Sequence, residues 1–292
     1  MNKKKIYPMW FLFVPLAIYG VFFLLPSLLG IAYSFTDWNA RSLDGVNFVG
    51  FRNYINIFTS ERDYVTGIIN TLRFTIVSNI VKIIPALFIA ILLTEKLKGR
   101  GVYRTILFLP AIMPFVVIGL IFTSILNYNH GLLNQVLETI GLGFLRQRWL
   151  SDIDIVWGSV FGVDAWRGIG YVMTIFLAGL SSISKSYYEA AEIDGANFWH
   201  RLRYITLPML SSAITINLVF GITYGLRVFD IIFILTGGGP GQTTEVITTD
   251  VFRLYSSGQL ALATALNTLL LVMTAGIGIF IVKYMSKREV HQ

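Results

Sequence analysis

Two stretches inside long apolar runs carry polar, small and aromatic side chains. Members follow i, i+4, i+7 spacing, which places each set on one face of a helix. The candidate residues are Asp164, Gly168 and Tyr171 in the first stretch and Asn217, Gly221 and Tyr224 in the second, with Arg227 flanking it. Polar groups can hydrogen-bond sugar hydroxyls, aromatic rings can cover apolar sugar faces, and glycines leave room. The pattern suits a path for a polar, sugar-like solute.

The same residue types also suit close packing between helices, since glycine and small polar residues favour helix contacts in membranes. In that case Asp164 would pair with Arg167, and Arg227 with Asp230, each at i, i+3 spacing. The sequence leaves the two interpretations open. Lys82 also lies within an apolar run, where a charge must pair, reach the interface or face water. Its partner cannot be read from the sequence.

A polar island, residues 181–206, separates two of the apolar runs. Ser186 and Glu189 have the spacing of a capping box, which predicts a short helix that begins at Ser186. Gly195 can adopt the left-handed backbone that ends a helix, and Asn197 can cap a second helix. We therefore expect a bent pair of short helices outside the bilayer.

The composition of the chain indicates a membrane protein. Of 292 residues, 55% are hydrophobic and only 13% are charged, against about 25% charged in soluble domains. Six apolar runs approach or exceed the roughly 20 residues that cross the hydrocarbon as a helix. They cover about 9–34, 70–94, 103–127, 155–180, 207–235 and 260–284. We expect an all-α integral membrane protein with six transmembrane helices, forming a single domain over residues 1–292.

The distribution of Lys and Arg predicts the orientation, because cytoplasmic loops carry the excess of these residues. With the N-terminus inside, the cytoplasmic side receives Lys3, Lys4, Lys5, Lys96, Lys98, Arg100, Arg104, Lys185, Arg201, Arg203, Lys283, Lys287 and Arg288. The outer side receives only Arg41, Arg52, Arg62, Arg146, Arg148 and Arg253. Both termini are therefore predicted to be cytoplasmic. This bias accounts for the net charge of +7, so the charge does not indicate nucleic-acid binding.

Several site classes find no support in the sequence. The absence of Cys excludes disulfides, thiolate metal sites and cysteine catalysis. The three histidines are scattered, which argues against a metal cluster. The glycine-rich run at residues 236–241 lacks the Lys followed by Ser or Thr that a phosphate-binding Walker loop requires, so it predicts a structural turn. In another predicted outer loop, Leu132 to Ile140 has the pattern of an amphipathic surface helix.

The polar island also carries a long spaced motif. Its members are Glu189, Ala190, Ala191, Gly195, Ile205, Leu207 and Pro208. This motif resembles the EAA loop of permease subunits of binding-protein-dependent ABC importers. Residues 176–180, the Asp194 to Ala196 triplet, and residues 229–240 are similar to the sugar-importing branch, which includes maltose-type and glycerol-phosphate-type permeases. Ser212 departs from the pattern, because many members have a second proline there.

The resemblance implies that the bent helix pair fits a groove on a cytoplasmic ATPase dimer. The residues expected to contact the ATPase are Glu189, Ala190, Ala191, Asp194, Gly195 and Ala196. Small side chains would allow close backbone approach, and the carboxylates offer charge-assisted hydrogen bonds. ATP and Mg would be bound by the ATPase and no cofactor by this chain. Further expected partners are a second homologous permease, an extracytoplasmic solute-binding protein and the lipid bilayer of a prokaryotic cell membrane.

Three functions are weighed against these features. An importer subunit for an oligosaccharide or related glycan, working by alternating access, accounts for the polar island. An ion-gradient-driven secondary transporter of a small polar solute would predict inverted repeats and carboxylates at the membrane midplane, and it leaves the island unexplained. A membrane-embedded enzyme would need a His-rich or paired-carboxylate constellation that no apolar run carries.

Overall fold

The computed structural model describes residues 10–40, 45–59, 63–94 and 98–286. Among the basic residues used to predict orientation, Lys3, Lys4, Lys5, Arg41, Arg62, Lys96, Lys287 and Arg288 lie outside these ranges. Contacts divide the chain into two units, Met1–Val65 with Asp250–Leu271, and Thr66–Thr249 with Val272–Gln292. Each unit is described by itself.

The described residues of both units form helices, turns and loops, with no β-strand among them. An isolated bridge joins Thr36 to Phe48. The expectation of an all-α fold is therefore confirmed.

The first unit contains a long apolar helix, followed by a loop and the short helix α3 (Arg52–Thr59). The helix is built from α1 (Trp10–Tyr19), a π-helical turn (Gly20–Leu24) and α2 (Leu25–Tyr33). The unit also holds parts of α14 (Ile247–Ser256) and α15 (Leu260–Ser286). Asn53 on α3 donates hydrogen bonds of 2.8 Å to the carbonyls of Ser34 and Thr36. These bonds fasten α3 to the end of α2.

The Asp37 side chain reinforces the backbone hydrogen bonds that close the loop between α2 and α3. Both carboxylate oxygens of Asp37 accept hydrogen bonds from Asn47, one from the backbone amide at 2.7 Å and one from the side-chain amide at 3.1 Å. The backbone bond, followed by the side-chain bond, holds the pKa of Asp37 below its usual value of 3.8. These hydrogen bonds favour the charged carboxylate, which keeps the loop closed at neutral pH.

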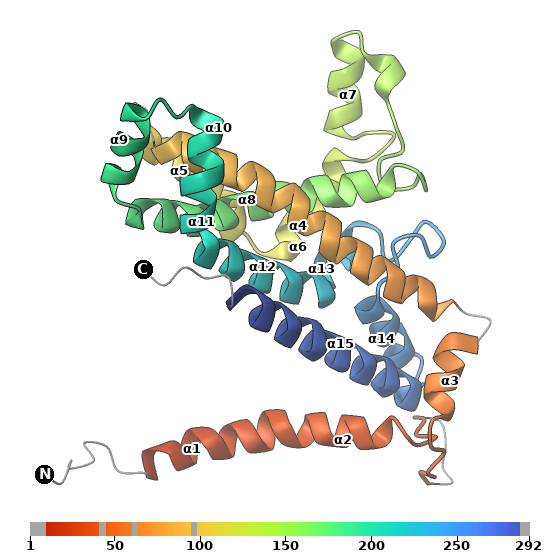
Figure 1. Ribbon diagram of the computed structural model, residues 1–292. Coiled ribbons are helices and arrows are strands. Elements are labelled where there is room, and N and C mark those ends of the chain that lie inside the picture. Colours follow the sequence, from red (N-terminus) through yellow and green to blue (C-terminus); the bar gives the residue numbers. More distant parts are fainter. Residues whose placement is uncertain (1–9, 41–44, 60–62, 95–97, 287–292) are drawn as a thin grey trace, which may run out of the picture. The chain divides into compact units, whose positions relative to one another are not determined.

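The second unit is built around α4 (Tyr64–Thr94), α8 (Val156–Ser182) and α12 (Ser211–Leu226) (Figure 1). Their inner faces share one hydrophobic cluster, formed by Ala86, Ala90 and Leu93 of α4, Val172, Met173, Phe176 and Leu177 of α8, Ile183, Leu210, and Ala213 of α12. Small residues on α4 and α12 allow these helices to approach the bulky side chains of α8. This packing fixes the three helices that carry most of the polar candidates.

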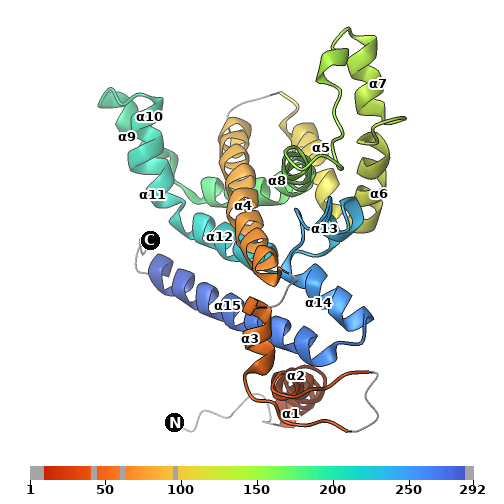
Figure 2. The same ribbon diagram turned by 90° about the vertical axis from the view of Figure 1, so that its right-hand side faces the viewer.

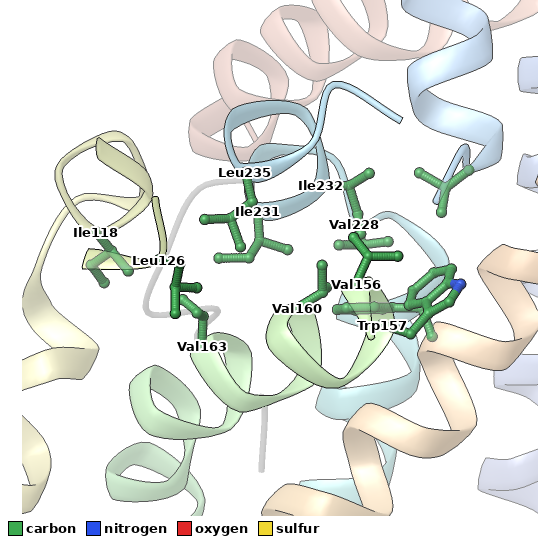
Figure 3. Close-up of a cluster of buried hydrophobic side chains, with 12 residues drawn as sticks. Ile118, Leu126, Val156, Trp157, Val160, Val163, Val228, Ile231, Ile232 and Leu235 are labelled. Carbon is green, nitrogen blue, oxygen red and sulfur yellow. The ribbon is translucent and has the colours of Figure 1, made fainter. Parts of the chain in front are cut away.

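A second cluster joins α8 to α6 (Phe115–Ile125) and α13 (Asp230–Leu235). In Figure 3, Val156, Val160 and Val163 of α8 point toward α13, which presents Ile231, Ile232 and Leu235. Ile118 of α6 joins the cluster from the side. The N-terminal half of α8 is therefore enclosed by short helices and by α4, which contributes Phe74 to the cluster.

Two of the predicted spans are not single uninterrupted helices. The run at 103–127 forms α5 (Arg100–Ile112) and α6, which meet at a bend of 98°. Met113 is extended and Pro114 follows it, as expected because proline disfavours helical backbone at the preceding residue. The run at 207–235 divides into α11 (Leu207–Met209), α12 and α13, and the segment Phe198–Met209 meets α12 at 69°.

In the part of the chain that the structure describes, four helices are long and apolar enough to cross a membrane, namely Phe11–Tyr33, Tyr64–Thr94, Val156–Ser182 and Leu260–Tyr284. The number rises to six in the described ranges if each bent pair counts as one span. The remaining predictions on topology, six spans with cytoplasmic termini in a single domain, stay predictions.

The two predicted features of the outer loops have helical and turn geometry as expected. The amphipathic segment forms α7 (Leu132–Thr139), and the chain turns after Leu235 through Gly237 and Gly238 with positive φ. Asn70 of α4 donates hydrogen bonds of 3.0 and 2.9 Å to the carbonyls of Thr243 and Glu245. The glycine-rich run is therefore a turn whose far end is pinned to α4. In both views of the second unit, α7 lies at the opposite end from the helix pair α9 (Lys185–Ile193) and α10 (Phe198–Arg201) (Figure 2).

The closest crossing of α5 and α8 requires a glycine and gives a stability prediction. A Cβ at Gly170 would lie 2.0 Å from the carbonyl oxygen of Leu107, whereas a Cβ at Gly162 of the same helix would meet nothing within 4 Å. We expect Gly170→Ala to lower the free energy of unfolding by about 1–3 kcal/mol, through overpacking. Gly162→Ala should leave it unchanged or raise it by about 0.5–1 kcal/mol. Thermal unfolding of the two purified variants in detergent compares them, and equal midpoints would contradict the close crossing.

Candidate functional site

A cavity of about 350 Å³ opens between α4, α8 and α12. Six of the seven candidate path residues line it, namely Asp164, Gly168, Tyr171, Asn217, Gly221 and Tyr224. Further lining residues are Asn79 and Lys82 of α4, Ala111 of α5, Arg167 and Val172 of α8, and Phe220 of α12. The helical spacing in the sequence thus brings two distant stretches to the same cavity. Whether a solute passes there stays a prediction.

Arg227 does not line this cavity. It lines a neighbouring one of about 310 Å³, together with Asp230 and Phe115. Tyr224 and Phe220 line both cavities and form the wall between them. The reason is the end of α12 at Leu226, after which the helical register is lost and Arg227 adopts a non-helical backbone.

A buried ion pair lies in the wall of the cavity between α4, α8 and α12. The Lys82 Nζ atom lies 2.8 Å from Asp164 Oδ2, and the side chains are 7% and 2% exposed. Ser78 donates a 2.6 Å hydrogen bond to the same carboxylate oxygen, and the Tyr224 hydroxyl donates one of 2.7 Å to the other. The Lys82 ammonium also lies 4.4 Å from the centre of the Tyr224 ring. Asp164 is thus fully coordinated by α4 and α12.

This arrangement corrects the alternative pairing within α8. Asp164 pairs with Lys82 of another helix, and Arg167 instead lies over the Phe115 ring, with its Cζ atom 3.5 Å from the ring centre. The Arg167 Nε atom is buried without a hydrogen-bond partner among the described residues. The Phe115 ring in turn stacks on Tyr224 at 6.2 Å. Arg167 is therefore a cation at the cavity wall with no carboxylate of the described chain bound to it.

Asn217 offers an unused acceptor to the cavity. It is 2% exposed, its amide nitrogen donates a long bond of 3.5 Å to the Val172 carbonyl, and its Oδ1 atom has no partner among the described residues. A buried polar atom without a hydrogen bond is costly. An occupant of the cavity whose hydroxyl group donates a hydrogen bond to Asn217 Oδ1 would satisfy this atom.

The two candidate glycines are required by close neighbours. A Cβ at Gly221 would lie 1.8 Å from Asn79 Oδ1, and one at Gly168 would lie 2.5 Å from Lys82 Cδ. Both glycines therefore admit polar side chains of α4 between α8 and α12. No spacing pattern pairs Asn79 or Ser78 with these positions, although both are polar residues within an apolar run.

The polar island forms two short helices that are fastened to each other. They are α9 (Lys185–Ile193) and α10 (Phe198–Arg201), followed by a π-helical turn (Leu202–Thr206) and α11. Glu192 forms an ion pair with Arg201, and the Tyr188 hydroxyl lies 3.1 Å from Thr206 Oγ1. We call residues 184–206 the coupling pair. These contacts join its first helix to the segment that leads into α12.

The ends of the two helices follow the sequence prediction in part. Gly195 has φ of 75°, and the amides of Gly195 and Ala196 donate to the carbonyls of Glu192 and Ala191, which is a Schellman ending. Asn197 Oδ1 accepts the amide of His200 at 2.9 Å, so the predicted second cap is confirmed.

The predicted start of the first helix is wrong. The cap is Ser184, whose hydroxyl accepts the amide of Ser186, and α9 begins at Lys185. Ile183 and Ser184 are extended, so the cap lies two residues before the expected Ser186. The residue three after Ser184 is Tyr187, so no capping box with Glu189 forms.

The surface of the coupling pair is open and mixed in character. Of the candidate contact residues, Glu189, Ala190, Asp194 and Gly195 are exposed, and Ala191 and Ala196 are partly exposed. Ile193 is 87% exposed and Trp199 64% exposed. Carboxylates, small residues and large apolar side chains thus share one surface, which is typical of a docking site. Contact with a partner stays a prediction here.

Metal binding has no candidate in the described ranges, where no group of three or more His, Asp or Glu residues comes together. His291 lies outside those ranges.

Comparison with known proteins identifies the family. The family described as binding-protein-dependent transport system inner membrane component matches residues 71–290. The chain belongs to this family. The resemblance predicted from the EAA loop is therefore confirmed, and the chain is a transport component of the membrane.

Three relatives of the permease cover nearly all of it. It is 33% identical to the trehalose/maltose transport system permease protein MalF of Thermococcus litoralis, over 92% of this chain and 90% of that one. It is 33% identical to the multiple sugar-binding transport system permease protein MsmF of Streptococcus mutans, over 96% and 95%. A chain of a bacterial alginate ABC transporter, solved in complex with an alginate pentasaccharide-bound periplasmic protein, superposes with a TM-score of 0.78 at 26% identity, covering 96% and 94%.

The buried ion pair of the permease gives a second stability prediction. Lys82→Met leaves the Asp164 carboxylate buried without its counter-charge, so we expect a loss of about 3–5 kcal/mol of unfolding free energy. The double variant Lys82→Met with Asp164→Leu should lose less than the single variant, because no unpaired charge remains. Thermal unfolding in detergent, followed by tryptophan fluorescence, measures both. Lys98→Met, which removes an exposed charge, serves as control. A double variant less stable than Lys82→Met would contradict the energetic dependence of Lys82 and Asp164 on each other.

Proposed function

We propose that this chain is one transmembrane subunit of an ATP-driven ABC importer that translocates an oligosaccharide or related glycan by alternating access. The observation that carries the proposal is the coupling pair, an exposed surface of carboxylates, small residues and apolar side chains held rigid by its own ion pair and hydrogen bonds. A segment with so much exposed apolar surface calls for a partner.

The proposed partner is a cytoplasmic ATPase dimer that binds ATP and Mg. Glu189, Ala190, Ala191, Asp194, Gly195 and Ala196 are proposed to contact it. In this proposal, the small residues admit its backbone, and Glu189 and Asp194 form charge-assisted bonds with it. A second homologous permease would complete the translocation path, and an extracytoplasmic solute-binding protein would deliver the cargo to the outer loops. The solved relative in complex with a periplasmic protein supports the last of these partners.

The proposed topology has six spans in one permease domain with both termini in the cytoplasm. The four long helices and the two bent pairs supply the required number. The basic residues Lys98, Arg100, Arg104 and Lys185 then lie on the same side as the coupling pair, as the positive-inside rule requires.

The proposed path runs through the cavity between α4, α8 and α12. Asp164, Gly168, Tyr171, Asn217, Gly221 and Tyr224 line it, and Arg227 lines the adjoining cavity. Aromatic walls, an unused amide oxygen and a cation suit a solute with hydroxyl groups on an apolar ring. The names of MalF and MsmF support sugar as the cargo.

A secondary transporter is supported less well. Ion coupling would need a carboxylate in the cavity that can bind a proton or cation. The carboxylate that lines this cavity, Asp164, is already held by Lys82, Ser78 and Tyr224.

Charge reversal tests the coupling pair. Glu189→Lys should abolish most co-purification of the ATPase subunit and uncouple ATP hydrolysis from uptake, because a positive charge replaces a proposed acceptor of charge-assisted bonds. The complex is assembled by co-expressing both permeases and the ATPase, and ATPase recovery is quantified on an affinity tag. Asp154→Lys, an equal charge reversal on an exposed loop of the other end, is the matched control. Full recovery and normal uptake by Glu189→Lys would remove this role.

Removal of the Asn217 side-chain amide, whose oxygen has no partner among the described residues, tests the proposed cargo path. Asn217→Ala should raise the KM for uptake about tenfold while leaving basal ATPase activity unchanged, since a lost hydrogen bond of this kind is worth about 1–1.5 kcal/mol. Proteoliposomes are supplied with the binding protein and a panel that includes maltose, trehalose and an alginate oligosaccharide. Asn129→Ala, on an exposed loop, is the control. An unchanged KM for every transported sugar would assign Asn217 to helix packing instead.

A further inference from the structure

A second polar cavity, of about 550 Å³, lies between the coupling pair and the ends of α4, α5 and α8. We call it the basic pocket. Four cationic side chains line it, namely Arg100, Arg104, Lys185 and Arg201. No Asp or Glu occurs among the described residues that line it. Arg201 is neutralised by Glu192, which leaves three cations to face an occupant.

An apolar groove of about 540 Å³ adjoins the basic pocket along α5 and α8. Its walls are formed mainly by Phe108, Leu109 and Ile112 of α5 and by Leu177 and Ala178 of α8. Arg104 and Ser181 line both cavities, so the charged and apolar spaces meet at these two residues. The groove follows α5 from Arg104 to Ile112, which is about 12 Å at the rise of an α-helix.

Arg104 at the junction has unused hydrogen-bonding capacity. Its Nε atom is buried without a partner among the described residues, and an Nη atom makes only a long bond of 3.4 Å to the Leu93 carbonyl. A buried guanidinium nitrogen without an acceptor is costly. An anion in the basic pocket would supply that acceptor.

We propose that the basic pocket and the apolar groove together bind one anionic phospholipid. The phosphate lies among Arg100, Arg104 and Lys185, and an acyl chain follows the groove between α5 and α8. Basic pockets between helices on the cytoplasmic side attract anionic headgroups, and the unpaired Arg104 nitrogen provides a built contact. A free phosphate would satisfy the charges but would leave the groove unfilled.

The position of the lipid gives it a mechanical consequence. Tyr188, Arg201 and Thr206 of the coupling pair also line the basic pocket. A bound headgroup therefore fills the space between this pair and the ends of the long helices. The inference uses the family's membrane location and the proposed cytoplasmic side, but it does not depend on the cargo or on contact with an ATPase.

Native mass spectrometry of the full chain in detergent tests the proposal. Phosphatidylglycerol and phosphatidylcholine with identical acyl chains are added in parallel, and retained lipid is counted per protein. We expect preferential retention of phosphatidylglycerol. Arg104→Ala should weaken it about fivefold, as expected for one cation near a headgroup, and Arg104→Lys should restore most of it. Arg148→Ala, which removes one charge from a loop at the other end, is the control and should have no effect.

The apolar half of the site is tested by filling the groove. Ala178 is exposed, so Ala178→Phe adds bulk there without entering the core, and it should lower phosphatidylglycerol retention. Inorganic phosphate is titrated as a competitor. If phosphate displaces the lipid and Ala178→Phe has no effect, the site takes a free anion and the lipid proposal is overturned.

Two further outcomes also overturn the proposal. One is equal retention of both lipids by the native chain. The other is that Ala178→Phe disrupts a dimer of this chain and still retains lipid. That result would identify the groove as a subunit interface. Circular dichroism checks that each variant is folded, and Arg100→Ala, at the exposed first residue of α5, replaces Arg104→Ala if that variant is not.

Discussion

Lys82 and Asp164 meet at 2.8 Å in a part of the second unit where both side chains are almost completely shielded. Separating such charges would leave each of them desolvated at a cost of several kcal/mol. The carboxylate therefore holds α4 through Lys82 and Ser78, and α12 through Tyr224. The two candidate glycines follow from the same constraint, because Gly168 makes room for the Lys82 stem and Gly221 for Asn79. The spacing of the three helices, and so the cavity between them, depends on this pair.

The pair also determines what the cavity has left to offer. Because Asp164 and Lys82 neutralise each other, the charge that remains is that of Arg167, which lies over Phe115. The unused acceptor is Asn217 Oδ1. A cavity with one diffuse cation, one amide acceptor and several aromatic rings favours a solute with many hydroxyl groups over a compact ion. This character agrees with the sugar cargo that we propose.

The sequence predicted features that depend on spacing within one helix. Residues at i, i+4, i+7 share one face of a helix. The six residues that this pattern selects on α8 and α12 therefore line one cavity once the two helices pack together. The partner of Lys82 could not be found in this way, because 82 residues separate it from Asp164 and only tertiary packing brings them together. Arg227 missed the cavity because α12 ends one residue earlier. Two apolar runs are broken by bends. The bend at Met113 could be expected, because Pro114 disfavours helical backbone at the residue before it. Hydropathy alone does not indicate the bend before Ser211.

The coupling pair and the cavity lie on one continuous segment of the chain. Tyr188 is hydrogen-bonded to Thr206, and Glu192 forms an ion pair with Arg201. These contacts connect α9 to the turn that leads through Pro208 into α12. Asn217 lies six residues after the first residue of α12, or about 9 Å along the axis. A helix transmits displacement along its axis because its backbone hydrogen bonds resist stretching, and the chain bends by 69° before Ser211. A force on the coupling pair would therefore rotate it about this bend and reach the cavity through α12. The bond from Tyr224 to Asp164 is among the contacts between α12 and α8 that such a movement would have to shift.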